Sequence, residues 1–181
     1  MDVHTLRREQ CLPGSPESVF AFFSDACNLE AITPPMLGFR ILTPGPIEMR
    51  AGTLIAYRLR VHGVAINWTT TIREWAPPHR FVDEQLRGPY ALWQHTHTFE
   101  DDGAGGTVMS DVVRYAIGFG PLGALARRLL VQRDLDAIFD YRAKRVRELI
   151  GAAGGSAQGD GATGLAGEKA FVAADARHPR R

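Results

Sequence analysis

The chain has 181 residues, of which 45% are hydrophobic and 23% are charged, and its formal net charge is +1. This length and composition suit one globular domain with a hydrophobic core. The near-neutral charge predicts no general attraction to nucleic acid, and no segment approaches the roughly 18 apolar residues of a membrane-spanning helix.

The amino-terminal region predicts a cytoplasmic protein that begins with a strand. The segment MDVHTLRREQ has no apolar stretch typical of a signal peptide, and Cys11 and Cys27 lack the spacing of a disulfide framework or a zinc site. A cytoplasmic, reducing location is therefore expected. Residues 1–11 are highly charged but are compatible with a first β-strand.

Two short helices are predicted after this strand. Ser15 is a good N-cap, Pro16 suits the first helical position, and the negative charge of Glu17 is favourable in the first turn. The segment DACNLEAIT, residues 25–33, is expected to form the second helix. Two consecutive prolines follow it and should end it.

The middle of the chain predicts a meandering antiparallel sheet. Segments with a period of two and many β-forming residues are GFRIL, GTLIAYRLRVH, INWTTTIREW, FVDEQL, LWQHTHTFED and TVMSDVVRYAI. Turn-forming residues separate them, at Gly63, at the GPY of residues 88–90 and at the DDGAGG of residues 101–106. Short turns between long strands favour antiparallel neighbours.

One long amphipathic helix is predicted to follow the sheet, from Pro121 to Gly151. Apolar residues recur in it at helical spacing, and charged residues lie between them. The basic residues, Arg142 among them, are expected on a solvated face. From Ala152 the sequence is rich in Gly and Ala, which predicts a disordered tail. The expected organisation is therefore a domain of residues 1–151 and a tail of residues 152–181.

The segment LWQHTHTF places two histidines between two aromatic residues on one face of a strand. Trp93, His95, His97 and Phe99 share that face, because successive side chains in a strand point to opposite sides. If the aromatic residues face the long helix, the same alternation turns Asp83, Gln85, Met109 and Asp111 inward on the neighbouring strands.

The turns predict how these polar side chains pair across strands. Asp83 is expected opposite His97, Gln85 opposite His95, and His97 opposite Asp111. The result is a row in which His97 lies between two carboxylates. A slip of two residues in register would exchange the partners but keep the same set inside.

Three interpretations of this row stay open. It is a polar network that fixes the register of the core, a floor that orients a ligand, or an acid–base site formed by His95, His97, Asp83 and Asp111. Two histidines and a carboxylate also suit zinc or non-haem iron. Gln85 fits a hydrogen-bond network better than a metal shell, so no metal and no cofactor is predicted.

The order of elements and several local phrases resemble the START-like (SRPBCC) superfamily. The phrases are FFSDACNLEAITPP, W-x-T-x-I from Trp68, F-x-D-E-Q-x-x-GPY-x-x-W-x-H-x-H-x-F, and T-x-M-x-D-V-V-x-Y. The resemblance covers about residues 3–150. It implies an α+β helix-grip fold, in which a curved antiparallel sheet wraps around a long C-terminal helix. It also implies a deep cavity between the two that takes apolar ligands.

The resemblance and the residues together predict a protein that binds a small hydrophobic or aromatic ligand. The expected partner is a polyketide, isoprenoid, quinone or fatty-acyl compound, with no nucleic acid and no stable membrane insertion. Predicted ligand contacts are Gln85, Trp93, Trp68, Tyr57, Tyr115, Phe81, Phe99 and Met109. One alternative is a cyclase/dehydratase-type enzyme that uses His/Asp acid–base chemistry on a polyketide-like substrate. The other is a protein-interaction module without a ligand.

Overall fold

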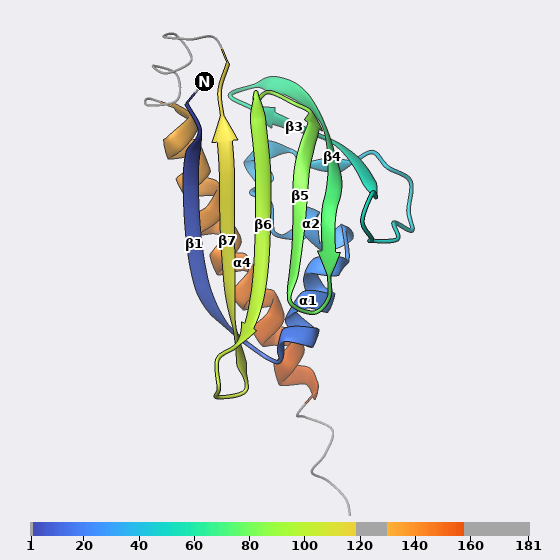
Figure 1. The fold of residues 1–181 in the computed structure, drawn as a ribbon, viewed down its shortest axis with the longest axis vertical. Coiled ribbons are helices and arrows are strands. Elements are labelled where there is room, and N and C mark those ends of the chain that lie inside the picture. The colour runs from blue at the N-terminus through green and yellow to red at the C-terminus, as the bar shows by residue number, and fades with distance from the viewer. Residues whose placement is uncertain (1, 119–129, 158–181) are drawn as a thin grey trace, which may run out of the picture.

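The framework of the computed structural model, which describes residues 2–118 and 130–157, is one antiparallel sheet of seven strands (Figure 1). The strand order is β1-β7-β6-β5-β4-β3-β2, so each strand after β1 lies beside the next along the chain. The strands are β1 His4–Pro13, β2 Arg40–Ile41, β3 Leu54–Val61, β4 Val64–Ala76, β5 Arg80–Arg87, β6 Leu92–Asp101 and β7 Gly106–Ala116. The predicted antiparallel meander is confirmed, and β1 adds an edge strand to it by pairing with β7.

The helices lie together on one side of this sheet (Figure 1). They are α1 Pro16–Ser24, α2 Cys27–Ala31, the 3-10 turn η1 Pro35–Leu37 and α4 Gln132–Ala157. Ser15 caps α1 as predicted, because its side-chain oxygen accepts a hydrogen bond from the backbone N–H of Ser18 at 3.4 Å. The arrangement is the expected helix-grip fold: two short helices after the first strand and a long helix after the last.

The long helix extends further than the sequence predicted. We expected it to end at Gly151, but α4 continues to Ala157. A glycine lowers helix propensity without forbidding the helix, and the alanines around it favour continuation. The predicted start at Pro121 and the tail beyond residue 157 lie outside the described residues. No described helix is long and apolar enough to cross a membrane.

A tight hairpin joins β3 to β4 and brings the edge of the sheet to α4. Val61 pairs with Val64, and the two residues between them, His62 and Gly63, have φ angles of 50° and 82°. Positive φ at both central positions is what a two-residue hairpin requires, which explains the glycine. The His62 ring nitrogen lies 2.8 Å from a carboxylate oxygen of Asp134 on α4.

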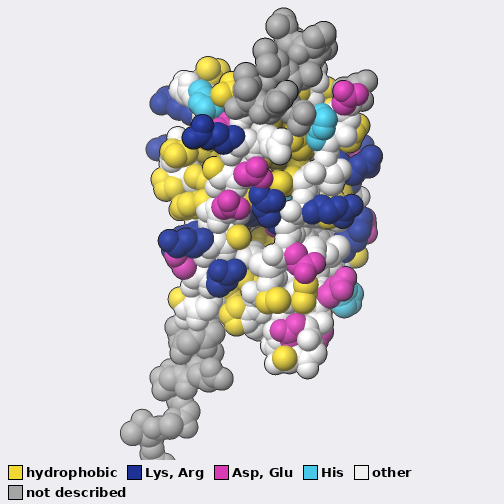
Figure 2. Space-filling model, turned by 90° about the vertical axis from the view of Figure 1, so that its left-hand side faces the viewer, with side chains coloured by type: hydrophobic (Ala, Val, Ile, Leu, Met, Phe, Trp, Pro, Cys, Tyr) yellow, Lys and Arg dark blue, Asp and Glu magenta, His cyan; other side chains and the backbone are white. Residues whose placement is uncertain are grey.

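The apolar face of α4 packs on the sheet through Leu135, Phe139, Val146 and Ile150, all of them buried. At the other edge, the guanidinium of Arg8 on β1 pairs with Asp136 of α4 at 2.5 Å. The face around β1 and α4 carries acidic and basic side chains interspersed rather than a basic stripe (Figure 2). Surface pairs of this kind contribute about 0–1 kcal/mol each, so the buried apolar contacts hold the helix.

The core consists of two clusters that meet at the histidines. One cluster includes Phe81 and Phe99, and the other includes Val113 and Phe139. The ring of His97 stacks on Phe81 with centroids 4.1 Å apart, and the ring of His95 meets Phe139 edge-on at 5.5 Å.

The pairing of β5 with β6 differs from the prediction by two residues. Asp83 is opposite His95, and His97 is opposite Phe81. The predicted pairing of Asp83 with His97 is therefore wrong, as is that of Gln85 with His95. The turn explains this difference. The Gln85 side chain donates a hydrogen bond to the backbone C=O of Tyr90 and accepts one from its backbone N–H. Gln85 therefore belongs to the turn, and the strand pairing ends at Glu84. The predicted pairing of His97 with Asp111 is confirmed.

Candidate functional site

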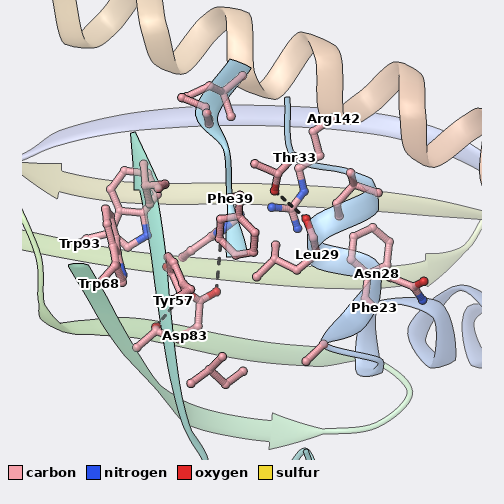
Figure 3. A pocket seen from close by; sticks show the side chains of 18 of the residues that line it. Phe23, Asn28, Leu29, Thr33, Phe39, Tyr57, Trp68, Asp83, Trp93 and Arg142 are labelled. Atoms are coloured by element: carbon pink, nitrogen blue, oxygen red, sulfur yellow. Dashed lines mark hydrogen bonds and ion pairs between the residues drawn. The ribbon is translucent and has the colours of Figure 1, made fainter. Parts of the chain in front are cut away.

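A cavity of about 210 Å³ lies between the sheet, the short helices and α4 (Figure 3). Aromatic rings form much of its wall. Its lining includes Tyr57, Trp68, Phe81 and Trp93 from the sheet, Phe23 and Leu29 from α1 and α2, and Leu135, Ile138, Phe139 and Arg142 from α4. These strands bury apolar side chains on one face and bend around α4, so the rings meet the helix side chains across the open space.

The structure places four of the eight predicted ligand contacts in this wall: Tyr57, Trp68, Phe81 and Trp93. Tyr57 and Trp68, opposite each other on β3 and β4, stack with centroids 5.8 Å apart. Trp93 meets Trp68 edge-on at 5.3 Å. The three rings form one continuous aromatic surface at this end of the cavity.

The other four predicted contacts are not among the described residues that line the cavity. Phe99 and Met109, 0% and 1% exposed, lie inside the core cluster that α1 covers. Tyr115 is buried beside Tyr90 and Trp93 in the second cluster. Gln85 is held by the backbone of Tyr90 in the turn. Phe99, Met109 and Tyr115 are buried as the alternation predicted, but the buried face of the sheet extends beyond the cavity.

Two aspartates and two histidines form a compact network at the cavity wall. Nε2 of His95 lies 2.9 Å from Oδ1 of Asp111, and Nε2 of His97 lies 3.3 Å from Oδ2 of Asp83. Nδ1 of His97 is 2.8 Å from the same Asp111 oxygen, an ion-pair distance without hydrogen-bond geometry. His97 therefore lies between two carboxylates, despite the shifted register. The contact of His95 with Asp111 was not predicted, because the expected register paired His95 with Gln85.

The surroundings drive the pKa values of the two histidines in opposite directions. Burial would lower the pKa of His97, but its contacts with Asp111 and Asp83 outweigh burial, and this pKa is raised. Burial and the neighbouring charge of His97 lower the pKa of His95. The ring centroids are 3.8 Å apart, so two positive charges there would repel strongly.

Both carboxylates are ionised despite their burial. Burial would raise the pKa of Asp111, but hydrogen bonds and charge from His95 and His97 hold it well below its ordinary value. The pKa of Asp83 is likewise lowered against the effect of burial, by His97, His95 and Arg142. Between the lowered pKa of His95 and the raised pKa of His97, the network thus has two negative carboxylates and one charged imidazole, that of His97.

This proton arrangement leaves a lone pair on one ring nitrogen of His95. A carboxylate only accepts hydrogen bonds, so the Nε2 that meets Asp111 carries the proton of neutral His95. The lone pair of His95 is then on Nδ1, which lies 3.8 Å from Asp83, beyond hydrogen-bond distance. Asp83, His95 and His97 line the cavity, whereas Asp111 lies outside the lining and orients both rings. The arrangement can take a proton from a bound molecule at His95.

The same side chains include the donor set of the metal alternative. One ring nitrogen each of His95 and His97 and a carboxylate oxygen of Asp83 lie within 4.8 Å of one another. Zinc and non-haem iron take such ligands, and Asp111 would orient both rings from behind. Without a metal, the same distances between the histidine nitrogens and the aspartate oxygens fit a hydrogen-bonded network in which histidine protons lie between the two groups.

Two buried N–H donors in the cavity wall have no hydrogen-bond partner among the residues that the structure describes: Nε1 of Trp68 and Nε of Arg142. Arg142 was predicted on the solvated face of the helix, and this is wrong. Its side chain points from α4 into the cavity near Thr33 and Leu29, and its guanidinium carbon lies 5.8 Å from the ring centre of Phe23 (Figure 3). Its one sequence signal is its place next to the apolar stripe, four residues before buried Val146.

Most of the chain matches one known protein family. The sequence profile of the family described as polyketide cyclase / dehydrase and lipid transport matches residues 3–151. The chain belongs to this family. The match covers the whole of the sheet and most of α4, so all four network residues and the cavity lie within it. A search of curated proteins finds no significant match.

Several solved structures share the fold of this family member, although their sequence identity to it is low. The protein TTHA0849 from Thermus thermophilus is 20% identical, with a TM-score of 0.67 over 83% of this chain and 99% of that one. The Zhui aromatase/cyclase from Streptomyces is 14% identical, with a TM-score of 0.68 over 90% and 100%. A norcoclaurine synthase from Thalictrum is 15% identical, with a TM-score of 0.59 over 81% and 96%. At these identities the likeness extends to the fold alone.

Proposed function

We propose that the protein binds a small, largely apolar or aromatic molecule in the cavity between the sheet and α4. The observation that supports this most is the aromatic surface of Tyr57, Trp68 and Trp93 around an open space inside the domain. Each Å² of apolar ligand surface buried there would contribute about 25 cal/mol. Family membership agrees, since the family description covers both cyclases and lipid transport.

The size of the cavity sets the scale of the ligand. Its volume of about 210 Å³ is below the roughly 300–1,000 Å³ of pockets for drug-sized molecules. We therefore expect a small ring system, such as a polyketide fragment or a quinone head, or a short isoprenoid or acyl chain. The unpaired Trp68 N–H would hold an acceptor oxygen of the ligand and fix its orientation.

Titration with the fluorescent apolar probe N-phenyl-1-naphthylamine tests this proposal. The wild-type protein should bind it with a blue-shifted emission, and Trp93→Ala should weaken binding about tenfold by removing part of the aromatic wall. Leu86→Ala is the matched control, because Leu86 is 51% exposed on β5 outside the lining. Equal affinity in the wild type and both variants would refute binding at this wall.

A second candidate function is cyclase/dehydratase-type catalysis on a polyketide-like substrate, with His95 as the base. The observation that favours it is the Nδ1 lone pair of His95 at the cavity, with Asp111 fixing the tautomer from behind. A base of lowered pKa stays unprotonated at neutral pH and can remove a proton next to a carbonyl group.

Deuterium exchange at the central carbon of 1-phenylbutane-1,3-dione, followed by NMR, tests the catalytic candidate. The wild type should accelerate exchange, and His95→Asn should remove the acceleration. His62→Asn is the control, because His62 lies in the exposed hairpin. If the dione binds but its deuterium exchange is no faster than in buffer, the catalytic candidate is refuted and only the binding function stands.

A further inference from the structure

Arg142 is the only arginine or lysine among the described residues that line the cavity. It comes from the inner face of α4, and its guanidinium lies over the ring of Phe23 at 5.8 Å (Figure 3). Its Nε is buried and has no hydrogen-bond partner within the described part of the chain. A fixed positive charge is thus directed into a mostly aromatic space.

The neighbouring polar groups are already engaged with the backbone. The hydroxyl of Thr33 donates to the carbonyl of Leu29 at 2.6 Å, and the amide of Asn28 donates to the carbonyl of Phe22 at 2.8 Å. Among the described residues no carboxylate lies within ion-pair distance of Arg142, whereas Arg8 and Arg145 each pair with an acid. The ring of Phe23 offers only a weak electrostatic partner. The carboxylate of Asp83, which Arg142 helps to keep ionised, lies beyond ion-pair distance.

A charge in such a place is costly unless a bound group pairs with it. The planar guanidinium is suited to an oxyanion, because two of its N–H groups can bond two oxygens in parallel. The network of Asp83, His95, His97 and Asp111 has a net negative charge at the same cavity, so it repels a second acidic group. The cavity therefore favours a ligand with one acidic end and an uncharged remainder.

We propose that the ligand is a small apolar molecule with a single oxyanion, such as a carboxylate, which Arg142 binds while the apolar part contacts Tyr57, Trp68 and Trp93. This proposal rests on the proposed binding function and specifies the ligand class. It also assigns Arg142 as the residue that distinguishes acids from their neutral analogues.

Competition with matched ten-carbon compounds tests the proposal. Decanoate, decan-1-ol, decylamine and decyl phosphate would each displace N-phenyl-1-naphthylamine from the wild-type protein and from Arg142→Met, Arg142→Lys and Arg145→Met. Arg145 is the control, because it lies on α4 one turn away and pairs with Glu148 at 3.0 Å. Thermal unfolding of each variant checks that it is folded.

Decanoate should bind the wild type and Arg145→Met about 10- to 100-fold more tightly than decan-1-ol, as expected for a charge-assisted contact. Arg142→Met should lose this preference, and Arg142→Lys should keep part of it. Decyl phosphate, compared with decanoate, shows whether the natural acid is a phosphate or a carboxylate. If Arg142→Met does not fold, the proposal is tested by two results: the preference of the wild type for decanoate over decan-1-ol, and the reduction of that preference in Arg142→Lys.

Equal binding of decanoate and decan-1-ol by the wild type, or an unchanged preference in Arg142→Met, would overturn the proposal while leaving apolar binding intact. Tighter binding of decylamine than of decanoate would also overturn it. Failure of the probe and of all four compounds to bind would instead contradict the proposed function itself. The two failures are therefore distinguishable.

Discussion

Replacing Asp111 with asparagine is expected to destabilise the protein in a way that depends on pH. Asp111→Asn keeps the size of the side chain but removes the negative charge that both histidines contact at 2.8 and 2.9 Å. The side chain is 9% exposed, so water cannot replace the lost partner. His97, whose pKa this carboxylate helps to raise, would keep Asp83 as its single acidic neighbour.

The magnitude follows from the burial of the pair. Removing one partner of a buried ion pair costs about 3–5 kcal/mol, and losing hydrogen bonds to neutral groups costs about 1–3 kcal/mol. A group with a raised folded-state pKa, such as His97, stabilises the fold fully below its unfolded pKa near 6.5. That contribution is lost as pH rises through the folded-state pKa. The deficit should thus be about 3–5 kcal/mol at pH 5.5 and smaller at pH 8.5.

Urea unfolding of the wild type and Asp111→Asn at these two pH values measures both deficits. Asp136→Asn is the matched control, because Asp136 pairs with Arg8 at the surface, with 42% of its side chain exposed. Its cost should be about 0–1 kcal/mol at either pH. A deficit for Asp111→Asn that is equal at both pH values, or larger at pH 8.5, would refute the charged His97 between two carboxylates.

Three further predictions test the same region. NMR titration of the imidazole resonances should give His97 a pKa above 6.5 and His95 a pKa below it, and two equal values would contradict the arrangement of protons. Phe139→Ala should lower the free energy of unfolding by about 3–5 kcal/mol, because Phe139 is 4% exposed and packs against His95. Leu86→Ala, at an exposed position, should lower it by no more than about 0.5 kcal/mol. An equally small loss for Phe139→Ala would show that Phe139 lies outside the core. Dialysis against EDTA should leave the melting temperature unchanged, since histidine protons already pair both carboxylates; a fall restored by zinc or ferrous iron would favour the metal alternative.

The strands and helices could be predicted from local signals, and their helix-grip arrangement from the resemblance to the START-like superfamily. Ser15 and Pro16 mark the start of α1, and Gly63 marks a hairpin that only positive φ angles can close. The alternation in β6 also identified the inward set that contains His95 and His97. These features depend on local chemistry and on a period of two, which the sequence displays directly.

The partners within the site could not be predicted in the same way. Register across β5 and β6 depends on how Gln85 closes the turn with Tyr90, and that bond is a property of the folded loop. The inward direction of Arg142 depends on the cavity that opens between α4, the short helices and the sheet, which exists only in the folded protein. A charged residue on an amphipathic helix is ordinarily expected on the solvated side, so periodicity alone predicted the wrong face.

Heteronuclear NMR of the three tryptophan indole N–H groups tests the central claim most directly, that the cavity between the sheet and α4 is the binding site. Trp68 and Trp93 line the cavity, whereas Trp75 packs outside it against Phe20 and Phe81. Addition of N-phenyl-1-naphthylamine should shift the signals of Trp68 and Trp93 in a saturable way and leave Trp75 unchanged. Saturable binding that shifts Trp75 alone, or none of the three, would contradict the account.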